Sequence, residues 1–247
     1  MKSKANRCSE RLYSYSLPKY SYSLSKYSYS LPKITRQSAV IAILVALLGI
    51  EYTSLHAFEL EDKNLRECVA QIAKKNKWTT AQQFTKIKCH NKKIHSVVGL
   101  QEFNNLRALS LYNNNIKQAE LSGLTRLEEL NLARNKLTSF SLSNLPVLNK
   151  VYLFNNRLVT LELNSLPSFK LIKVNNNLLT QFNYNALEKL EKIVVFNNKL
   201  EHFDIHQLPT LKYMDARQNP MPDKLYEEMD KMKGTTFLHD GNAEDWQ

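Results

Sequence analysis

One stretch decides the fold of this 247-residue chain: LRALSLYNNNI at residues 106–116, followed by LEELNLARNKL at 127–137 and LNKVYLFNNRL at 148–158. The same frame continues as FKLIKVNNNLL at 169–179 and LEKIVVFNNKL at 190–200. In each copy, apolar residues hold the first, fourth, sixth and eleventh positions, and asparagine holds the ninth. A fixed period of 21 residues indicates one supersecondary unit stacked repeatedly.

Each copy predicts a short strand followed by a turn. Apolar residues at alternating positions give a strand with one buried face, and stacked repeats bury that face against one another. The asparagine is expected to turn inward, where its amide bonds to backbone groups at the bend. We therefore expect a structural role, and no ligand-binding role, for six asparagines: Asn114, Asn135, Asn156, Asn177, Asn198 and Asn219.

The array is atypical at both ends. Its first copy, FTKIKCHNKKI at 84–94, has Lys92 in the asparagine position and a 22-residue step to the next copy. Its last copy, LKYMDARQNPM at 211–221, keeps the asparagine but weakens the apolar frame. Over residues 84–221 the chain resembles the leucine-rich repeat family, in the 21-residue form common in bacterial proteins. The resemblance implies a mainly β, right-handed leucine-rich-repeat solenoid of about seven repeats, with short helical caps at both ends.

The second half of each repeat also alternates. Phe140 and Leu142 in one copy correspond to Leu161 and Leu163 in the next. In three copies a later leucine is followed by proline, which breaks a long helix. We therefore expect short extended segments, rather than helices, on the side opposite the main strands.

Helical segments are expected to cover both ends of the array, because an open solenoid end would expose its core. Apolar residues at helical spacing predict one helix over about 62–75 and another over about 223–233 that stops at Gly234. We divide the chain into a low-complexity stretch and signal peptide (1–57), an N-terminal helical cap (58–83), the repeats (84–221), and a C-terminal helical cap with a polar tail (222–247).

Residues 1–57 are expected to direct export. Residues 13–33 repeat a Tyr/Ser-rich unit without an apolar face. A basic segment, an apolar run from Ala39 to Ile50 and the small residue Ala57 then follow in the order of a secretory signal. The run is shorter than the ~20 residues of a spanning helix, so a signal-anchor is the weaker alternative and no stable membrane span is expected. Translation from Leu31 would give a signal peptide of ordinary length.

Two of the three cysteines are expected to pair. Cys68 lies on the apolar face of the first predicted helix, and Cys89 takes an inward position of the first strand. Both then face one junction, which export would place in an oxidising compartment. We predict a Cys68–Cys89 disulfide, with two buried reduced thiols as the alternative. Cys8 would be removed with the signal peptide.

Charge and motifs argue against several function classes. The formal charge is +11, but residues 1–57 hold eight basic and two acidic residues, which leaves +5 for the remainder and weakens the case for nucleic-acid binding. Phosphate-binding loops and nucleophile elbows are absent from the sequence, so we predict no enzyme activity and no cofactor. His202 and His206 lie four apart in an expected extended segment without further ligands, so no metal site is predicted.

The outward positions of the strands, on the concave face that such a solenoid would have, predict a binding surface. Large aromatic residues recur there without a core role, and ten basic side chains surround them against four acidic ones. An aromatic cluster in a basic field favours an acidic partner, whereas mutual cover by neighbouring side chains is the alternative. The candidate ligand-binding residues are Tyr112, Lys150, Tyr152, Phe154, Lys173, Lys192 and Phe196.

These features predict an exported, non-enzymatic leucine-rich-repeat protein. We expect a monomer that binds another protein, or an envelope glycan, through its concave face. The compartment would be the periplasm, the cell surface or the medium. Two alternatives stay open: a structural, self-associating cell-envelope protein, and a secreted effector acting on a host protein.

Overall fold

The structure is a computed structural model that describes residues 58–241. The predicted signal peptide, the low-complexity stretch and Cys8 fall in residues 1–57, outside the described residues, and so does most of the predicted polar tail, at 242–247. Between residues 58 and 241, no helix has both the length and the apolar character needed to cross a membrane.

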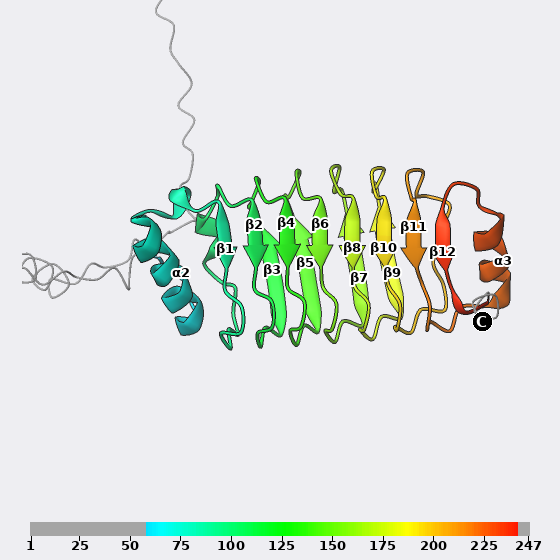
Figure 1. Cartoon of the computed structure of the whole chain (residues 1–247), viewed down its shortest axis with the longest axis horizontal. Helices are drawn as coiled ribbons and strands as arrows, with labels where there is room; N and C mark the ends of the chain where they lie inside the picture. Colours follow the sequence, from blue (N-terminus) through cyan, green and yellow to red (C-terminus); the bar gives the residue numbers. More distant parts are fainter. Residues whose placement is uncertain (1–57, 242–247) are drawn as a thin grey trace, which may run out of the picture. The chain divides into compact units, whose positions relative to one another are not determined.

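Eight short parallel strands form the main sheet (Figure 1). Their order in the sheet follows their order in the sequence, and from β2 to β11 each strand pairs with residues 21 positions away, as Leu109 does with Leu130. At about 4.8 Å per strand, the sheet runs roughly 34 Å along the solenoid axis. The strands are β1 (Lys86–Lys88), β2 (Ala108–Ser110), β4 (Glu129–Asn131), β6 (Lys150–Tyr152), β8 (Leu171–Lys173), β10 (Lys192–Val194), β11 (Tyr213–Asp215) and β12 (Thr236–Leu238).

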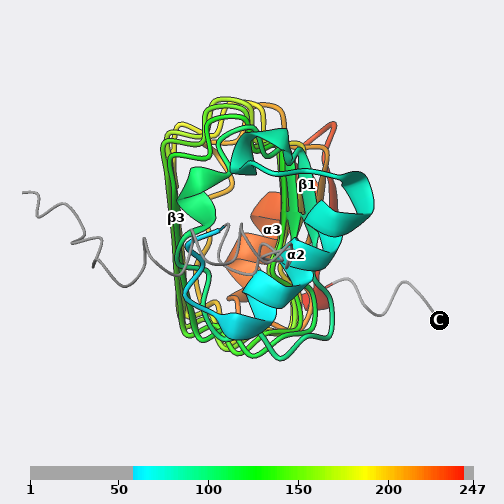
Figure 2. The ribbon, with the colours of Figure 1, turned by 90° about the vertical axis from the view of Figure 1, so that its left-hand side faces the viewer.

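A second layer faces the main sheet across the core (Figure 2). It contains two pairs of parallel strands, which confirm most of the predicted extended segments, whereas the predicted segment around Phe203 and Ile205 forms no strand among residues 58–241. One pair joins β3 (Gln118–Ser122) to β5 (Ser139–Ser143), and the other joins β7 (Thr160–Asn164) to β9 (Gln181–Asn185). The solenoid is therefore mostly β, as the sequence indicated.

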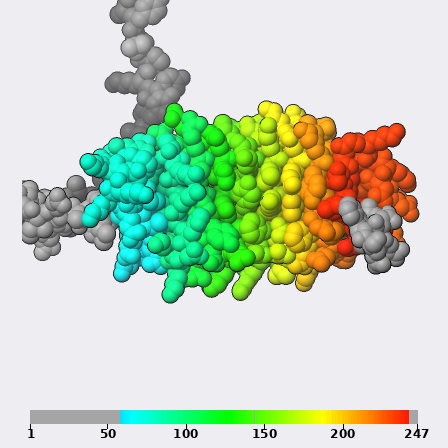
Figure 3. Space-filling model, viewed as in Figure 1, coloured from blue at the N-terminus to red at the C-terminus, as the bar shows by residue number. Residues whose placement is uncertain are grey.

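The core lies between the two layers. The middle residue of each main strand is buried: Ile87, Leu109, Leu130, Val151, Ile172, Ile193, Met214 and Phe237. Successive repeats pack directly against one another in the space-filling view (Figure 3). Each repeat therefore completes the core of its neighbours, as expected of a solenoid.

The repeated asparagines line one edge of this core. The Asn177 amide donates hydrogen bonds to the carbonyls of Val174 (2.9 Å) and Leu153 (3.1 Å). Its oxygen accepts from the Leu158 amide at 3.0 Å. Corresponding bonds form at the other five asparagines, so each side chain ties its own repeat to the one before it.

The first end of the solenoid is covered by α2 (Lys63–Asn76), close to the predicted 62–75. Asp62 begins this helix because its carboxylate accepts from the Leu65 amide at 2.9 Å. The same carboxylate accepts from the His95 amide at 2.8 Å, which attaches the helix start to the first repeat. Two short 3-10 turns, Ala81–Gln83 and Leu100–Glu102, complete this end.

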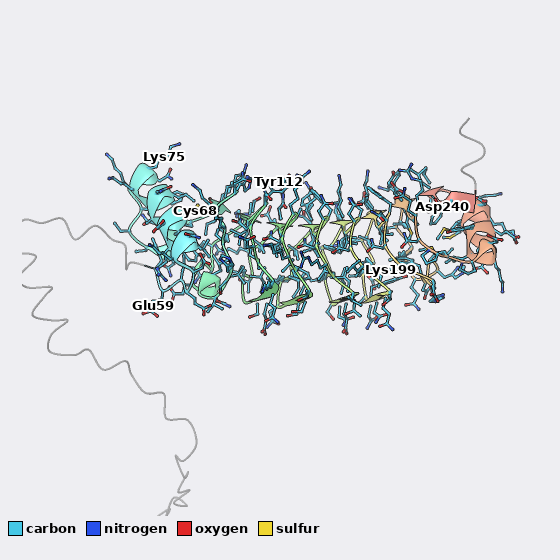
Figure 4. All side chains as sticks on the ribbon, turned by 90° about the horizontal axis from the view of Figure 1, so that it is seen from below. Glu59, Cys68, Lys75, Tyr112, Lys199 and Asp240 are labelled. Carbon is cyan, nitrogen blue, oxygen red and sulfur yellow. A yellow bond between two sulfur atoms is a disulfide. The ribbon has the colours of Figure 1, made fainter. Side chains whose placement is uncertain are left out.

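The predicted disulfide is confirmed. Cys68 on α2 is bonded to Cys89, which follows β1, and their Cα atoms are 6.0 Å apart. Figure 4 labels Cys68 at this end of the solenoid. Both cysteines are buried, so the bond staples the helix to the first repeat from within.

The other end differs from the prediction in two ways. The helix is α3 (Asp223–Lys231), which stops before the predicted 233 because Met232 takes an extended backbone (φ −77°, ψ 115°). Gly234 then adopts a positive φ of 88°, which reverses the chain. This reversal feeds β12, an eighth strand that the sequence analysis missed and that pairs in parallel with β11.

Candidate binding face of the eight-stranded sheet

The candidate residues lie on one surface, the outward side of the eight-stranded sheet, which we call the sheet face. Each three-residue strand buries its middle residue and turns its first and third residues outward. Lys150 and Tyr152 occupy these positions on β6, Lys173 on β8 and Lys192 on β10. Tyr112, Phe154 and Phe196 form a further column, two residues beyond the ends of β2, β6 and β10. Figure 4 shows Tyr112 projecting from the solenoid.

The aromatic rings of the sheet face are half-buried, so neighbouring side chains cover part of each ring. Tyr112 and Phe154 come from strands two places apart, which alone would separate them by about 9.6 Å. Their ring centroids are only 6.5 Å apart. Ala133, the residue between them in this column, is completely buried. The two rings therefore lean together over a small residue and form a joint apolar surface.

Cations sit against two rings of the sheet face. The Lys192 ammonium lies 4.2 Å from the centroid of Tyr213, and the Arg134 guanidinium lies 5.8 Å from that of Tyr112. Both distances are within the range of cation–π attraction. Val194, the third residue of β10, is only 8% exposed and adds little surface.

Most acidic groups of this face are already paired. Glu128 contacts Arg107 at 2.5 Å, and Asp215 contacts Arg217 at 2.9 Å. Glu191 lies 3.0 Å from Lys212 and 3.6 Å from Lys170. A hydrogen bond from Lys212, then its charge, lower the pKa of Glu191. Because these ion pairs neutralise their members, the other charges of the sheet face determine its electrostatic potential.

The remaining charges were counted from the sequence, but most were not recognised as site residues. Within residues 58–241, no ion pair joins these charges to another side chain: Lys86, Lys88, Glu129, Lys150 and Lys173, together with Arg134 and Lys192, which lie against aromatic rings. Strand alternation marks the outward positions in the sequence, but it does not show which neighbouring charges pair. Glu129 and Lys150, for example, stand in register on adjacent strands without an ion pair.

A hollow of about 170 Å³ opens in the sheet face near its first end. Its lining includes Ala108 and Ser110 on β2, with Lys86 on one side and Glu129 on the other. The His90 Nε2 atom and the Ser110 hydroxyl are 2.7 Å apart. The small side chains of β2 thus leave room for a side chain of a partner.

The histidines and cysteines near the sheet face do not gather into a metal-ligand cluster in the described part of the chain. No group of three or more His, Cys, Asp or Glu residues there is placed to hold a metal ion. His202 and His206 are both exposed, and His206 contacts Glu228 on α3 at 3.6 Å. His90 and Cys89 cannot act as a pair, because Cys89 is committed to the disulfide.

The fold resembles several solved structures. These include the APL1 leucine-rich repeat domain (23% identity, TM-score 0.48) over 57% of this chain and 38% of that one. A leucine-rich repeat protein of Leptospira interrogans (21%, TM-score 0.42) aligns over 56% of this chain and 44% of that one. YopM from Yersinia enterocolitica (22%, TM-score 0.45) aligns over 64% of this chain and 36% of that one.

The alignments therefore span less than half of each of these three solved chains. No family model matches the sequence, and no curated protein matches it. The repeated frame and the stacked turns of 21 residues give the chain the fold of a leucine-rich-repeat solenoid.

Proposed function

We propose that this protein is an exported, non-enzymatic leucine-rich-repeat protein that holds a protein partner on the sheet face. This is the surface that is expected from the sequence to be concave. The observation that carries the proposal is the ring pair of Tyr112 and Phe154, on a face that also bears lysines without an ion pair among residues 58–241. Joined aromatic surface anchors protein interfaces, and surrounding charge speeds the encounter. The unpaired lysines favour an acidic partner over a neutral envelope glycan.

Export is supported by the Cys68–Cys89 bond, because disulfides persist mainly in oxidising compartments. Cell fractionation of the producing organism tests this part. Detection in the periplasm, on the surface or in the medium agrees with it. Recovery only from the cytoplasm would contradict it.

The binding site is tested by cross-linking and pull-down from the native envelope and medium, using the full chain. The test variant carries Tyr152→Ser, Phe154→Ser and Phe196→Ser. We expect the partner captured by the unchanged protein to be lost. Circular dichroism and thermal melting establish that the variant is folded, which is required because these rings are half-buried.

A matched control replaces three exposed apolar side chains that lie outside the outward columns of the sheet face: Val147→Ser, Val159→Ser and Leu178→Ser. This control is expected to keep the partner. A second test variant, Lys150→Glu with Lys173→Glu, changes charge without removing packed rings and is expected to weaken capture. Full retention by both test variants would refute the sheet face as the site. Concentration-dependent self-association without a partner would instead favour the structural envelope alternative.

A further inference from the structure

We infer that the sheet face selects a partner segment with a particular charge pattern: an acidic residue, a basic residue and a second acidic residue, each three positions apart along a polyproline II segment. This inference rests on the proposed function and names the chemistry of the partner. It comes from the order of unpaired charges along the solenoid and from the spacing of the strands.

The first charged zone lies on β1. Lys86 and Lys88 are both exposed and form no ion pair with the described residues. They hold the first and third positions of one strand, so both side chains project from the same face of the sheet. This zone fits an acidic side chain.

The second zone has the opposite sign. Glu129 on β4 is exposed, and its side chain makes no ion pair in the described part of the chain, although Lys150 is its register neighbour. The neighbouring Glu128 is different, since Arg107 already neutralises it. Glu129 therefore presents a carboxylate that fits a basic side chain of the partner.

The third zone is positive again. Lys150 on β6 and Lys173 on β8 lie one and two strands beyond Glu129. The following cation, Lys192, is drawn to the ring of Tyr213, and the charges of β11 pair with each other. The sign along the solenoid axis thus changes from positive to negative and back to positive.

Strand spacing converts this order into residue spacing. β1 and β4 are two strands apart, about 9.6 Å, and β4 and β8 are separated by the same distance. Side chains of a β-strand alternate between two faces, so residues three apart in a strand would point in opposite directions. A polyproline II helix advances about 3.1 Å per residue with three residues per turn, so three residues cover each interval and every third side chain lies on the same face. A segment running along the axis would place residues i, i+3 and i+6 over the three zones.

The hollow between the first two zones supports this path. Its volume is about 170 Å³, and its lining includes Lys86, Lys88, Glu129 and the small residues Ala108 and Ser110. The main chain of a segment that crosses β2 can approach the sheet at this hollow without displacing a large residue. Its residues i and i+3 then lie over β1 and β4.

Synthetic peptides test the pattern. The matched probe is acetyl-Glu-Gly-Ser-Lys-Gly-Ser-Glu-amide, and the inverted probe exchanges every Glu for Lys and every Lys for Glu. A permuted probe keeps the matched composition but places the three charged residues side by side. Four copies of each, displayed on streptavidin, compensate for the weakness of exposed ion pairs, and binding to the full chain is measured by interferometry at low salt.

We expect the matched probe to bind about tenfold better than the inverted probe, as three exposed ion pairs allow, and several-fold better than the permuted probe. Glu129→Lys should transfer the preference to a probe with three acidic residues at the same spacing. Glu120→Lys, an equal charge change on β3 in the opposite layer, is the control and should keep the original preference.

Equal binding of the matched and permuted probes would overturn the inference, because net charge alone would then explain attraction. Absence of binding to all probes would overturn it as well. Neither result touches the proposed function, which stands or falls on partner capture by the aromatic variant. Conversely, if the variants of the sheet face still capture the partner fully, the proposed function is refuted even if the probes follow the pattern.

Discussion

The Tyr184 hydroxyl donates a hydrogen bond to the main-chain carbonyl of Asp204, one repeat further along the solenoid. Tyr184 belongs to β9, and the following repeat forms no strand in that layer within the described residues. The Tyr184 ring also packs against Phe203, with centroids 5.8 Å apart. One side chain therefore connects two repeats at the place where strand pairing in the second layer ends.

Tyr184→Phe removes this hydroxyl and keeps the ring packing. We expect the free energy of unfolding to fall by about 1 kcal/mol, because a partly buried carbonyl loses its donor. Urea denaturation at neutral pH measures the change. Tyr152→Phe is the control, since no hydrogen bond of its hydroxyl is seen among residues 58–241, and it should change stability little. Equal effects of the two substitutions would contradict the role of the Tyr184 bond.

Alkaline pH should expose the same residue. Burial, and then the charge of Asp204, raise the pKa of Tyr184 above its ordinary value of 10.0. Above that pH the unfolded chain loses this proton while the folded chain retains it, so the free energy of unfolding decreases as the pH rises. Stability is unaffected by this group at lower pH, where both states are protonated.

Denaturation curves across pH 9 to about 12 check this expectation. Tyr184→Phe should lose stability less steeply than the unchanged chain. Some slope should remain, because burial also raises the pKa of Tyr152, Tyr213 and Tyr226. Identical slopes for the two proteins would show that Tyr184 titrates normally.

Replacing a core asparagine should reduce the stability of the fold far more than replacing a neighbouring asparagine. Asn177→Ala leaves two carbonyls and one amide of the core edge without their partner, so we expect a loss of about 3 kcal/mol or more. Within residues 58–241, the Asn176 side chain bonds only to the side chains of Asn155 and Asn197, and its backbone has a positive φ of 56°. Asn176→Gly removes the side chain and tolerates this backbone conformation, so it should reduce stability by less than about 1 kcal/mol. Thermal unfolding compares the two, and a similar melting temperature for both would argue against the assigned difference.

The disulfide should stabilise the first end of the solenoid. Replacing Cys68 and Cys89 together by serine should lower the free energy of unfolding by about 3 kcal/mol, for a loop closed over 21 positions. Reductant should destabilise the unchanged chain and leave the double variant unaffected. Thiol titration in denaturant, with and without reductant, counts the bond directly. A melting temperature insensitive to reductant in the unchanged chain would oppose this prediction.

Local pattern was enough to predict most of the fold. The 21-residue frame placed the main strands, and helical spacing around Cys68 placed α2 within about one residue. The second end of the solenoid was harder to predict, because β12 does not lie in a copy of the repeated frame. Thr236–Leu238 becomes a strand only because Gly234 reverses the chain beside the open edge of β11.

The candidate site was predicted less completely. The columns of outward residues follow from strand alternation, so Tyr112, Phe154 and the lysines were found. The extent to which the rings cover one another stayed open, because it depends on how side chains lean across strands. The partners of Glu191, Lys170 and Lys212, likewise depend on side-chain directions that alternation leaves open.

The sequence by itself determined the repeat, the inward and outward positions, the asparagine turns and the facing cysteines. These depend on residues within one unit and on the period that copies it. Only the tertiary structure decided that Tyr112 contacts Phe154 over Ala133 and which charges neutralise each other. It also decided where strand pairing in the second layer ends, at the hydrogen bond between Tyr184 and Asp204. Those outcomes arise from competition among neighbours 20 or more residues apart, which short-range pattern does not resolve.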